Sequence, residues 1–350
     1  MTRLVDRCEQ PARHRLAGGG SARAARLVAV VLVIAAAGCH RGAAPDRFRI
    51  GFFPTVTHAA ALALVERGTL GRALAPITVE PRAFASGPEA IEALFAGAVD
   101  ACFVGPLPAL NGYLRSSGEA LQIVAGAASG GAAFVVAGAA HVTGPAWFHG
   151  KKLATPQLGN SQDVALRAWL VDAGLESTDR GGDVQVMPLA SPDILSLMRL
   201  GELDGAWVVE PWVARLVHEA GARVYLDEKT RWPGGRYPTA LLVVTRKLLD
   251  EHPDRVAKLL AAHVENIRWM KAHPDEARRV VADAIFKYSH KRLPESVMAD
   301  AYAHVEVTWD PLAETLPKLA AEGRRLDYLP KQGDPKKAVD ARLLDAELAR

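Results

Sequence analysis

The feature that most constrains the fold of this sequence is a pattern that occurs twice. Residues 88–106 read PEAIEALFAGAVDACFVGP, and residues 192–211 read PDILSLMRLGELDGAWVVEP. Each copy begins with Pro and an acidic residue, runs through apolar residues at helical spacing to a Gly, and reaches an Asp before a short apolar run. The Gly and Asp positions coincide at an offset of 104 residues: Gly97 with Gly201, and Asp100 with Asp204. We therefore predict the same helix, glycine stop and buried strand once in each of two similar lobes.

Alternating strand-like and helix-like segments extend this pattern over most of the chain. Apolar runs rich in β-branched and aromatic residues predict strands at 48–53, 77–84, 101–105, 183–189, 205–210 and 239–245. Apolar residues at helical spacing predict helices at 58–68, 87–97, 161–174 and 191–201. From Pro253 to the end, helical patterns dominate. Strands that alternate with helices of about ten to fifteen residues are typical of an α/β fold with parallel sheets.

The charge of the chain is concentrated at its start. The chain has 350 residues, 49% of them hydrophobic, so it can fill more than one core. Residues 1–38 contain six Arg against Asp6 and Glu9, which leaves 36 of the 42 basic and 37 of the 39 acidic residues in the remainder. A nearly neutral body without a basic stripe argues against a nucleic-acid partner, because binding to phosphates needs clustered Lys and Arg.

The first residues also predict export. A basic stretch precedes the apolar run 27–37, which has about the length of the hydrophobic part of a signal peptide and is short for a membrane span. The Gly38-Cys39 pair that follows resembles a bacterial lipobox, although Ala36 stands where Leu is usual. We expect a lipoprotein signal peptide at 1–38, lipidation of Cys39 and a tether over 39–47. The alternative is an ordinary secretory signal or an uncleaved anchor.

Cysteine usage agrees with this interpretation. Cleavage before Cys39 would remove Cys8 and leave Cys102 as the one cysteine that is not acylated. The mature chain would then contain no intramolecular disulfide, and its stability would come from hydrophobic cores. Cys102 lies in an apolar run, so we expect a small buried side chain there rather than a catalytic thiol.

Several segments together resemble one family of transport proteins. These segments are RIGFFPTVTHAAALALVERG, FASGPEAIEALFAGAVDACFVGPLPALNGY, QIVAGAASGGAAFVV, KKLATPQLGNSQDVALRAWL, AWVVEPWVARL and GARVYLDEKTRWPGGRYPTALLVV. They are similar to the substrate-binding proteins of ABC importers for nitrate, sulfonates, taurine and bicarbonate, over about 48–290. The resemblance implies a type II periplasmic-binding-protein-like fold, with a hinge of two crossover strands and a helical C-terminal region. We expect lobe 1 at 48–138 and 239–350, and lobe 2 at 139–238.

Small and hydrogen-bonding residues gather where predicted strands give way to helices. In open α/β sheets ligands lie beyond the carboxyl ends of the strands, where helix N-termini offer unpaired N–H groups to anions. Gly lets the backbone approach a ligand, and hydroxyl or amide side chains donate hydrogen bonds. Capping of the following helix is the alternative role for residues such as Ser86 and Asn160. The candidate ligand-binding residues of this kind are Thr57, His58, Ser86, Gly87, Gly105, Pro106, Ser129, Gly130, Asn160, Ser161, Gln162 and Tyr237. Thr239, close to Tyr237 in the loop that returns to lobe 1, is a further candidate for the hinge side of the cleft.

Two further candidates follow the strand of the second copy. Glu210 would oppose an anion unless it pairs with a base or faces a cationic or hydroxyl group, and Asp163 raises the same difficulty. A salt bridge at the hinge or at the rim of the cleft is the alternative role for Glu210. Trp212 is a candidate wall for the ligand, whereas Trp207 lies in the middle of a strand and is expected in the core.

The expected function follows from the resemblance and from the absence of enzyme motifs. The sequence contains no P-loop, G-x-S-x-G, H-E-x-x-H or paired-cysteine motif, so we expect no enzyme, no catalytic residue, no metal and no cofactor. We expect a monomeric, lipid-anchored, periplasmic or extracytoplasmic protein that captures a small anion such as a sulfonate, taurine or nitrate. Its partners would be an ABC permease and ATPase in the inner membrane. The alternatives are a binding protein for a pyrimidine, a thiamine precursor or another nitrogenous ligand, a sensory receptor, and an enzyme on this fold similar to pyrimidine-synthesis proteins.

Overall fold

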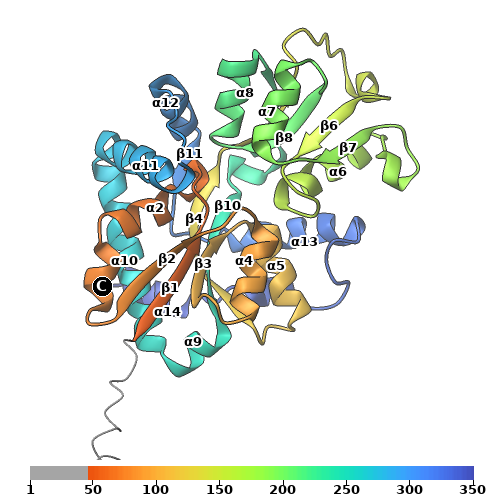
Figure 1. Ribbon diagram of the computed structural model, residues 1–350. Helices are drawn as coiled ribbons and strands as arrows, with labels where there is room; N and C mark the ends of the chain where they lie inside the picture. The colour runs from red at the N-terminus through yellow and green to blue at the C-terminus, as the bar shows by residue number, and fades with distance from the viewer. Residues whose placement is uncertain (1–45) are drawn as a thin grey trace, which may run out of the picture. The chain divides into compact units, whose positions relative to one another are not determined.

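The computed structural model describes residues 46–350, so the expected signal peptide, Cys39 and most of the expected tether lie outside the described residues. Arg47–Arg350 form one unit that contains two β-sheets with helices on their faces (Figure 1).

The first sheet has six strands in the order β11-β4-β10-β3-β1-β2. Strands β1, β2 and β3 are parallel, and β10 runs antiparallel between β3 and β4. The strands are β1 (Arg47–Phe52), β2 (Thr78–Ala83), β3 (Ala101–Val104), β4 (Leu121–Gly130), β10 (Pro238–Thr245) and β11 (Val305–Val307). The carboxyl ends of β1, β2 and β3 therefore meet at one edge, where the sequence placed candidate residues.

The second sheet has five strands in the order β7-β6-β8-β5-β9. Strands β6, β7 and β8 are parallel, and β5 runs antiparallel to both β8 and β9. The strands are β5 (Ala132–Val136), β6 (Lys152–Thr155), β7 (Gln185–Pro188), β8 (Gly205–Val209) and β9 (Arg223–Asp227). The sequence-based boundary at 138 assigned β5 to lobe 1, whereas β5 pairs only with strands of the second sheet among the described residues.

The chain crosses between the sheets twice. The first crossing is Gly131, between β4 and β5, and the second follows β9 through η4 (Glu228–Arg231) and η5 (Pro233–Gly235) to β10. Gly131 has φ +75, and a Cβ on it would lie 2.5 Å from Val305 Cγ2, so both backbone conformation and space require glycine there. Two crossings were expected, but the second runs through two 3-10 helices rather than through a strand.

Helices cover both faces of the first sheet. Figure 1 shows α4 and α5 on one face and α2, α10 and α11 on the other. Alternate residues of one strand enter the two cores: Phe103 packs with α2 and α10, and Cys102 packs with α4 and α5. The helices of this part are η1 (Val56–His58), α2 (Ala59–Glu66), α3 (Thr69–Leu74), α4 (Gly87–Phe95), α5 (Pro106–Arg115), α9 (Arg246–Glu251), α10 (Pro253–Ala272), α11 (Pro274–Ser289), α12 (Glu295–Ala303), η6 (Ala313–Thr315), α13 (Leu316–Arg325), η7 (Pro335–Ala338) and α14 (Arg342–Leu348).

The second sheet has its own two cores. The indole of Trp207, on β8, is buried and stacks on Phe134, on β5, with 5.6 Å between ring centroids. This confirms that Trp207 belongs to the core. The helices of this part are η2 (Pro145–Phe148), α6 (Ser161–Asp172), η3 (Thr178–Arg180), α7 (Ser191–Arg199) and α8 (Trp212–Ala220).

The repeated pattern folds as predicted, with the same hydrogen bonds in each copy. Helices α4 and α7 are followed by Gly97 and Gly201, which have φ +62 and +71, and strands β3 and β8 come next. Asp100 accepts a hydrogen bond from the backbone N–H of Arg49 at 2.7 Å, and Asp204 accepts one from Lys152 N–H at 2.9 Å. Each Asp therefore ties its turn to the neighbouring parallel strand.

Cys102 is free and fully buried, and burial raises the pKa of its thiol. A neutral thiol packed among apolar side chains fits the expected role of a small core residue. No helix among residues 46–350 is both long and apolar enough to span a membrane.

Candidate functional site

The N-termini of two helices from different sheets meet between the two sheets. Ser161 opens α6 on the second sheet, and its Oγ accepts a hydrogen bond from Leu107 N–H, in the first turn of α5, at 3.3 Å. A Cβ on Gly105 would lie 3.2 Å from the same hydroxyl oxygen. The structure therefore brings together Gly105, Pro106 and Ser161 of the candidate residues.

Thr239 lies in the same corner of the cleft. Its carbonyl oxygen is 4.0 Å from the point that a Cβ on Gly105 would occupy. Its hydroxyl is buried and has no hydrogen-bond partner in the described part of the chain. A buried hydroxyl without a partner costs free energy unless water or a ligand satisfies it.

Ser86 and Gly87 stand at the start of α4. The Ser86 hydroxyl makes no hydrogen bond to the helix that it precedes, so the capping role considered for it is not observed. A Cβ on Gly87 would lie 2.5 Å from Pro108 Cγ, which shows that α4 and α5 pack too closely for a side chain. Helix packing therefore explains why residue 87 is a glycine. The Ser86 hydroxyl is left available to hydrogen-bond a ligand.

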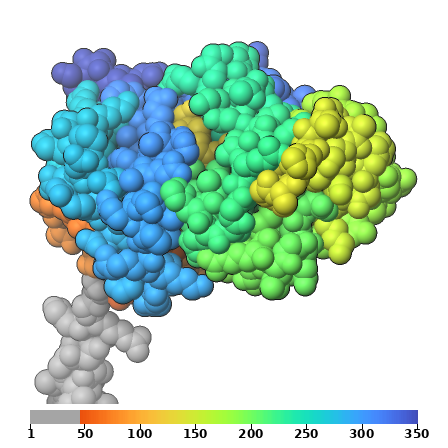
Figure 2. All heavy atoms as spheres, turned by 90° about the horizontal axis from the view of Figure 1, so that it is seen from above, coloured from red at the N-terminus to blue at the C-terminus, as the bar shows by residue number. Residues whose placement is uncertain are grey.

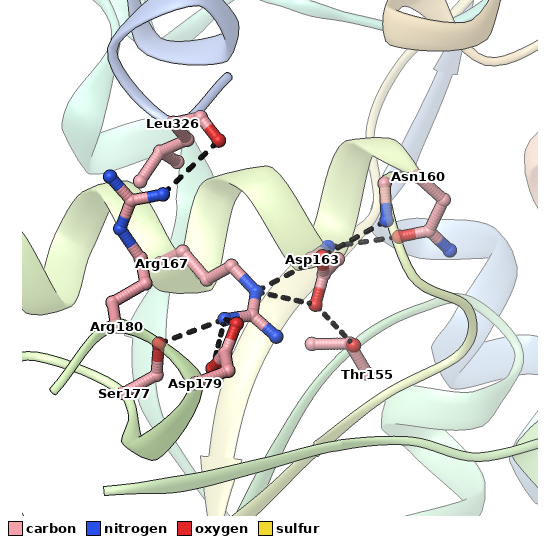
Figure 3. A network of polar contacts seen from close by, with 9 residues as sticks. Thr155, Asn160, Asp163, Arg167, Ser177, Asp179, Arg180 and Leu326 are labelled. Atoms are coloured by element: carbon pink, nitrogen blue, oxygen red, sulfur yellow. Dashed lines mark hydrogen bonds and ion pairs between the residues drawn. The ribbon is translucent and has the colours of Figure 1, made fainter. Parts of the chain in front are cut away.

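Asn160 caps α6 and belongs to a buried polar network (Figure 3). Its Oδ1 accepts a hydrogen bond from Asp163 N–H at 2.9 Å, so the capping role is confirmed. The Asp163 carboxylate is fully buried and accepts hydrogen bonds from Thr155 Oγ1, Gly159 N–H and Arg167 Nε at 2.9 to 3.1 Å. The network holds the end of β6, the loop and α6 together, which fixes the position of Ser161. Gln162 is half-buried beside it.

Arg167 supplies the charge that Asp163 needs. Its Nη1 donates to both carboxylate oxygens of Asp179 at 2.9 Å and to Ser177 Oγ at 2.9 Å (Figure 3). Burial lowers the pKa of Arg167, but Asp163 and Asp179 raise it by more, so the guanidinium stays charged. The buried acid that raised a difficulty in the sequence is therefore neutralised inside the second lobe.

His58 and Thr57 lie under the first strand–helix junction. His58 is buried, and burial lowers its pKa to about 3. Its Nδ1 accepts a hydrogen bond from Phe53 N–H at 3.3 Å, so the ring is neutral with Nδ1 as acceptor. Thr57 shares a hydrogen bond with Thr55 at 3.1 Å between hydroxyl oxygens. His58 therefore brings no positive charge to a ligand at neutral pH.

Tyr237 and Ser129 brace the hinge. The Tyr237 hydroxyl accepts a hydrogen bond from Ala132 N–H at 3.1 Å, and Tyr237 N–H donates to Ser129 Oγ at 3.3 Å. These bonds connect the second crossing to the first. Tyr237 is buried with its polar atoms engaged, so its contacts are those of a hinge residue.

Glu210 forms an ion pair that the sequence left open. Its Oε1 lies 2.8 Å from His304 Nδ1, and its Oε2 accepts a hydrogen bond from Ala214 N–H at 3.0 Å. The hydrogen bond to Glu210 is the main cause that raises the pKa of His304 above its ordinary value. Glu210 is buried and His304 is half-exposed, so the salt-bridge role considered for Glu210 is the one observed. Trp212 is half-buried, and the Arg215 guanidinium lies 4.6 Å from its ring centroid.

A pocket of about 280 Å³ opens beside this pair, and we call it the hinge pocket. Backbone and small side chains of 129–133 form one wall, and Glu210, Asp227, Lys229 and residues 303–306 form others. Figure 2 shows it as a hollow between the blue surface near residue 300 and the green surface of the second lobe. Of the candidate residues, Ser129, Gly130 and Glu210 line it, and Thr57 lies just beneath, since its Cγ2 is 3.5 Å from a Cβ placed on Gly131.

Each acid that lines the hinge pocket has a basic partner. Asp227 pairs with Lys229 at 3.0 Å, and Glu306 pairs with Arg236 at 3.4 Å. Among residues 46–350, no three or more His, Cys, Asp and Glu side chains are grouped so that they could hold a metal ion. The chemistry of the cleft and the hinge pocket is therefore hydrogen bonding and paired charge.

Sequence reasoning missed two residues of this region. His304 and Arg167 lie in helical stretches without a motif, and only their partners Glu210 and Asp163 were noticed as acids that needed a base. Thr239 was a candidate for the hinge side, and its position beside Gly105 comes from the sheet order β4-β10-β3. The unexplained acids were the signal in the sequence that bases had to be near.

Comparison with known proteins gives the family. A family model described as the NMT1-like family matches residues 41–286. A candidate binding protein of Brucella abortus (strain 2308) is 28% identical over 207 residues, which is 59% of this chain and 61% of that protein. The nitrate/nitrite binding protein of Synechococcus elongatus is 27% identical over 152 residues, 43% of this chain and 33% of that protein. The matches thus span about three fifths or less of the length of these curated relatives.

Solved structures give the fold. The alkanesulfonate-binding protein of Xanthomonas axonopodis pv. citri superposes with a TM-score of 0.69 at 19% identity, covering 86% of this chain and 100% of that one. The periplasmic nitrate-binding protein of Synechocystis PCC 6803 has a TM-score of 0.71 at 17% identity, covering 87% of this chain and 89% of that one. With the two sheets, the two crossings and the family match in agreement, the chain belongs to the NMT1-like family and has the periplasmic-binding-protein fold.

Proposed function

We propose that this protein is the solute-binding component of an ABC importer, and that it captures a small anion in the cleft between its two lobes. Relatives are named for aliphatic sulfonates, nitrate and bicarbonate, all of which are anions. In this proposal the chain is exported, anchored through a lipid on Cys39 and monomeric, and it delivers the ligand to a permease and ATPase. The lobes are 48–131 with 238–350, and 132–237.

The observation that carries this proposal is the meeting of the α5 and α6 N-termini. Each helix directs the positive end of its dipole toward the same corner, which favours an anion. Pro106 and Pro108 have no N–H, so Leu107 supplies the one N–H donor among the first three residues of α5. The Leu107 N–H, with no carbonyl partner in its own helix, is satisfied by Ser161 from the other lobe at 3.3 Å. An anion between the helices would receive such donors from both lobes. Thr239, whose carbonyl oxygen lies near Gly105, has a buried hydroxyl without a partner among the described residues, and in this proposal it is a further donor.

The paired acids weaken the objection to an anionic ligand. Asp163 shares the Arg167 guanidinium with Asp179, and Glu210 contacts His304. Each acid therefore has a basic partner that reduces the negative charge it presents to the cleft. A hydrogen bond to a charged ligand contributes about 1.5–3 kcal/mol, so a few donors from the two lobes suffice to bind a small anion and favour the closed arrangement.

A nitrogenous ligand is the second candidate, and a different observation favours it. Glu210, Asp227 and Glu306 line the hinge pocket, so a ligand there that carries N–H groups would find carboxylate acceptors. A cation or a pyrimidine would then compete with Lys229 and His304 for these acids. This candidate predicts binding at the hinge pocket instead of the α5 and α6 N-termini.

Thermal unfolding of the purified full chain with a ligand panel tests the proposal. The panel contains methanesulfonate, taurine, nitrate, bicarbonate, a pyrimidine and a simple amine. A ligand at about 100 times its Kd adds roughly 2.7 kcal/mol to the free energy of unfolding, which gives a measurable rise in Tm. Stabilisation by anions alone supports the proposal. Stabilisation by the pyrimidine or the amine, with no effect of any anion, refutes it in favour of the second candidate.

A variant pair locates the site. Ser161→Ala removes the hydroxyl that faces Leu107, and we expect it to weaken anion binding while the free protein unfolds at nearly the same temperature. Ser196→Ala is the control, because its hydroxyl donates only to Pro192 O at 2.9 Å on an exposed face of α7. Equal affinity in the two variants would show that the anion does not bind at the α5 and α6 N-termini.

A further inference from the structure

Two histidines and two carboxylates alternate in a row beside the hinge pocket, and we call them the ladder. His218 Nε2 lies 2.9 Å from Asp300 Oδ2, and Asp300 Oδ1 lies 3.9 Å from His304 Nε2. His304 Nδ1 then lies 2.8 Å from Glu210 Oε1. The row therefore runs base, acid, base, acid.

The ladder joins the two lobes. His218 is on α8 and Glu210 directly follows β8, so both belong to the second sheet and its helices. Asp300 is on α12 and His304 follows it, and α12 packs into the core of the first sheet through Val297, Met298 and Ala301. Each contact from His218 or Glu210 to its partner in the ladder thus crosses from one lobe to the other.

We propose that the ladder is a contact between the lobes whose strength depends on protonation. In this contact His304 positions residues 303–306, which form a wall of the hinge pocket. When His304 is protonated, the ladder holds the lobes closed, and when His304 is neutral the closed arrangement is less favoured. The inference rests on the proposed function in one respect: it assumes that closure of the lobes retains the ligand.

Burial of Glu210 makes the contact sensitive to charge. The residue is 1% exposed, and the Ala214 N–H occupies its second oxygen. When His304 is neutral, the buried carboxylate has no positive charge in contact with its side chain among the described residues. An open arrangement that lets water reach the carboxylate then becomes more favourable.

The direction of the pH effect follows from the pKa of His304. The hydrogen bond with Glu210 raises this pKa most, burial opposes it, and the charges of Glu210, Asp300 and Asp227 raise it further. The stabilisation of the closed arrangement is therefore fully present below the ordinary pKa of histidine, about 6.5, and is lost as pH rises through the raised pKa. Closure should weaken toward alkaline pH.

Several other charged groups on the surrounding elements form ion pairs of their own. On β9 and η4, Asp227 pairs with Lys229, and on β11 Glu306 pairs with Arg236. On α8, Arg215 pairs with Glu219 at 2.7 Å, and on α11 Arg278 bonds to Glu295 of α12.

Two groups of α12 and α8 remain. Tyr302 stays neutral, because burial raises its pKa to about 12. His218 is the second base of the ladder, and it contacts Asp300 but not Glu210.

Hydrogen–deuterium exchange of the full chain, followed by mass spectrometry, tests the inference without any ligand. The reporters are the peptides that cover 210–218 and 298–306, with rates corrected for the intrinsic effect of pH. For a half-exposed pair we expect exchange in both to rise roughly two- to fivefold between about pH 6 and 8.5. His304→Gln should show the high rate at every pH, and His304→Lys, which keeps its charge, should show the low rate throughout.

A matched control lies within one lobe. His149 pairs with Asp183 at 3.0 Å, both on the second lobe, so His149→Gln should behave as the wild type. The inference is overturned if His304→Gln keeps the wild-type pH profile, or if His304→Lys still responds to pH. Failure of every anion in the panel, with the exchange pattern as expected, would refute the proposed function and leave the ladder supported. If an anion binds but His304→Gln exchanges like the wild type, the proposed function is supported and the role of the ladder is refuted.

Discussion

Replacement of Arg167 by Met tests whether a buried ion pair supports the wall of the cleft. Met has a similar length and no charge, so the variant leaves Asp163, which is fully buried, without a cation (Figure 3). Asp163 keeps its bonds to Thr155 and to Gly159 N–H but loses two contacts of 3.1 Å to the guanidinium. Asp179 and Ser177 lose their donor as well. The carboxylate must then become protonated or be hydrated at a cost in stability.

The expected magnitude comes from burial. Removal of one partner of a buried pair typically costs about 3–5 kcal/mol in the free energy of unfolding, because the remaining charge is uncompensated. Over Arg47–Arg350, at about 2.1 cal/mol/K per residue, a loss of 4 kcal/mol lowers Tm by roughly 6 °C. The double variant Asp163→Asn with Arg167→Met removes both charges, so it should be more stable than Arg167→Met alone.

Urea unfolding and thermal unfolding of the three proteins at pH 7 measure these differences. Arg342→Met is the control: Arg342 pairs with Asp340 at 2.6 Å but is 82% exposed, so its loss should change the stability little. The reasoning is refuted if Arg167→Met is no more destabilising than Arg342→Met. It also fails if the double variant is less stable than the single one.

Three further predictions follow from the same structure. The double variant Ser86→Ala with Ser161→Ala should lower anion affinity by at least about tenfold, since each lost bond to a charged ligand is worth roughly 1.5 kcal/mol or more. The Tm of the free protein should change little. Burial raises the pKa of Glu228 to about 7, so the stability that the protonated carboxyl contributes is present at acidic pH and is lost as pH rises through 7. Glu228→Gln should therefore be more stable than the wild type by roughly 1–3 kcal/mol at pH 8 and equally stable at pH 4. Gly126→Ala should cost roughly 3 kcal/mol or more, because the new Cβ would lie 2.0 Å from Asp310 O.

Each of these has a measurement that decides it. Isothermal titration with the anion found in the panel checks the serine pair, and unchanged affinity would move the site elsewhere. A pH series of urea unfolding checks Glu228, and parallel profiles for the two proteins would contradict the raised pKa. Gly71→Ala is the control for Gly126, because nothing lies within 4 Å of its Cβ position in α3, and it should not destabilise.

Local patterns predicted the repeated unit because its determinants are local. Helical spacing, a Gly that adopts positive φ after the helix, and an apolar run that fits a buried strand all lie within about 20 residues of each other. The bonds of Asp100 and Asp204 to neighbouring strands add a tertiary reason for the same spacing in both copies. This is why the α/β class and the two-lobe arrangement were within reach of the sequence.

Local patterns could not predict which sheet β5 joins. The apolar residues 121–136 look alike on both sides of Gly131, and a strand pattern does not say which sheet it joins. Sheet membership is fixed by pairing of β5 with β8 and β9, which come more than 65 residues later. The boundary placed at 138 by the sequence is therefore late by the length of this strand.

The candidate site was predicted unevenly for a related reason. Residues at strand–helix junctions were identified as a set because topology brings such junctions to one edge, and Gly105 and Ser161 indeed meet there. Tyr237 and Ser129 were included for their position, but their contacts brace the hinge. Side-chain partners across the cleft depend on how the lobes pack, and no spacing in the sequence encodes that packing.

The difference between the two copies of the repeat now has a physical explanation. The first copy ends in Gly105, where bare backbone lets Ser161 of the other lobe approach Leu107 N–H. The second ends in Glu210, whose buried carboxylate contacts His304, 94 residues away. Both ends therefore make contacts between the lobes, one through a hydroxyl and one through an ion pair. In the proposed mechanism the first corner selects the anion, and the second sets how firmly the lobes close around it, so a change at Glu210 should alter retention more than ligand choice.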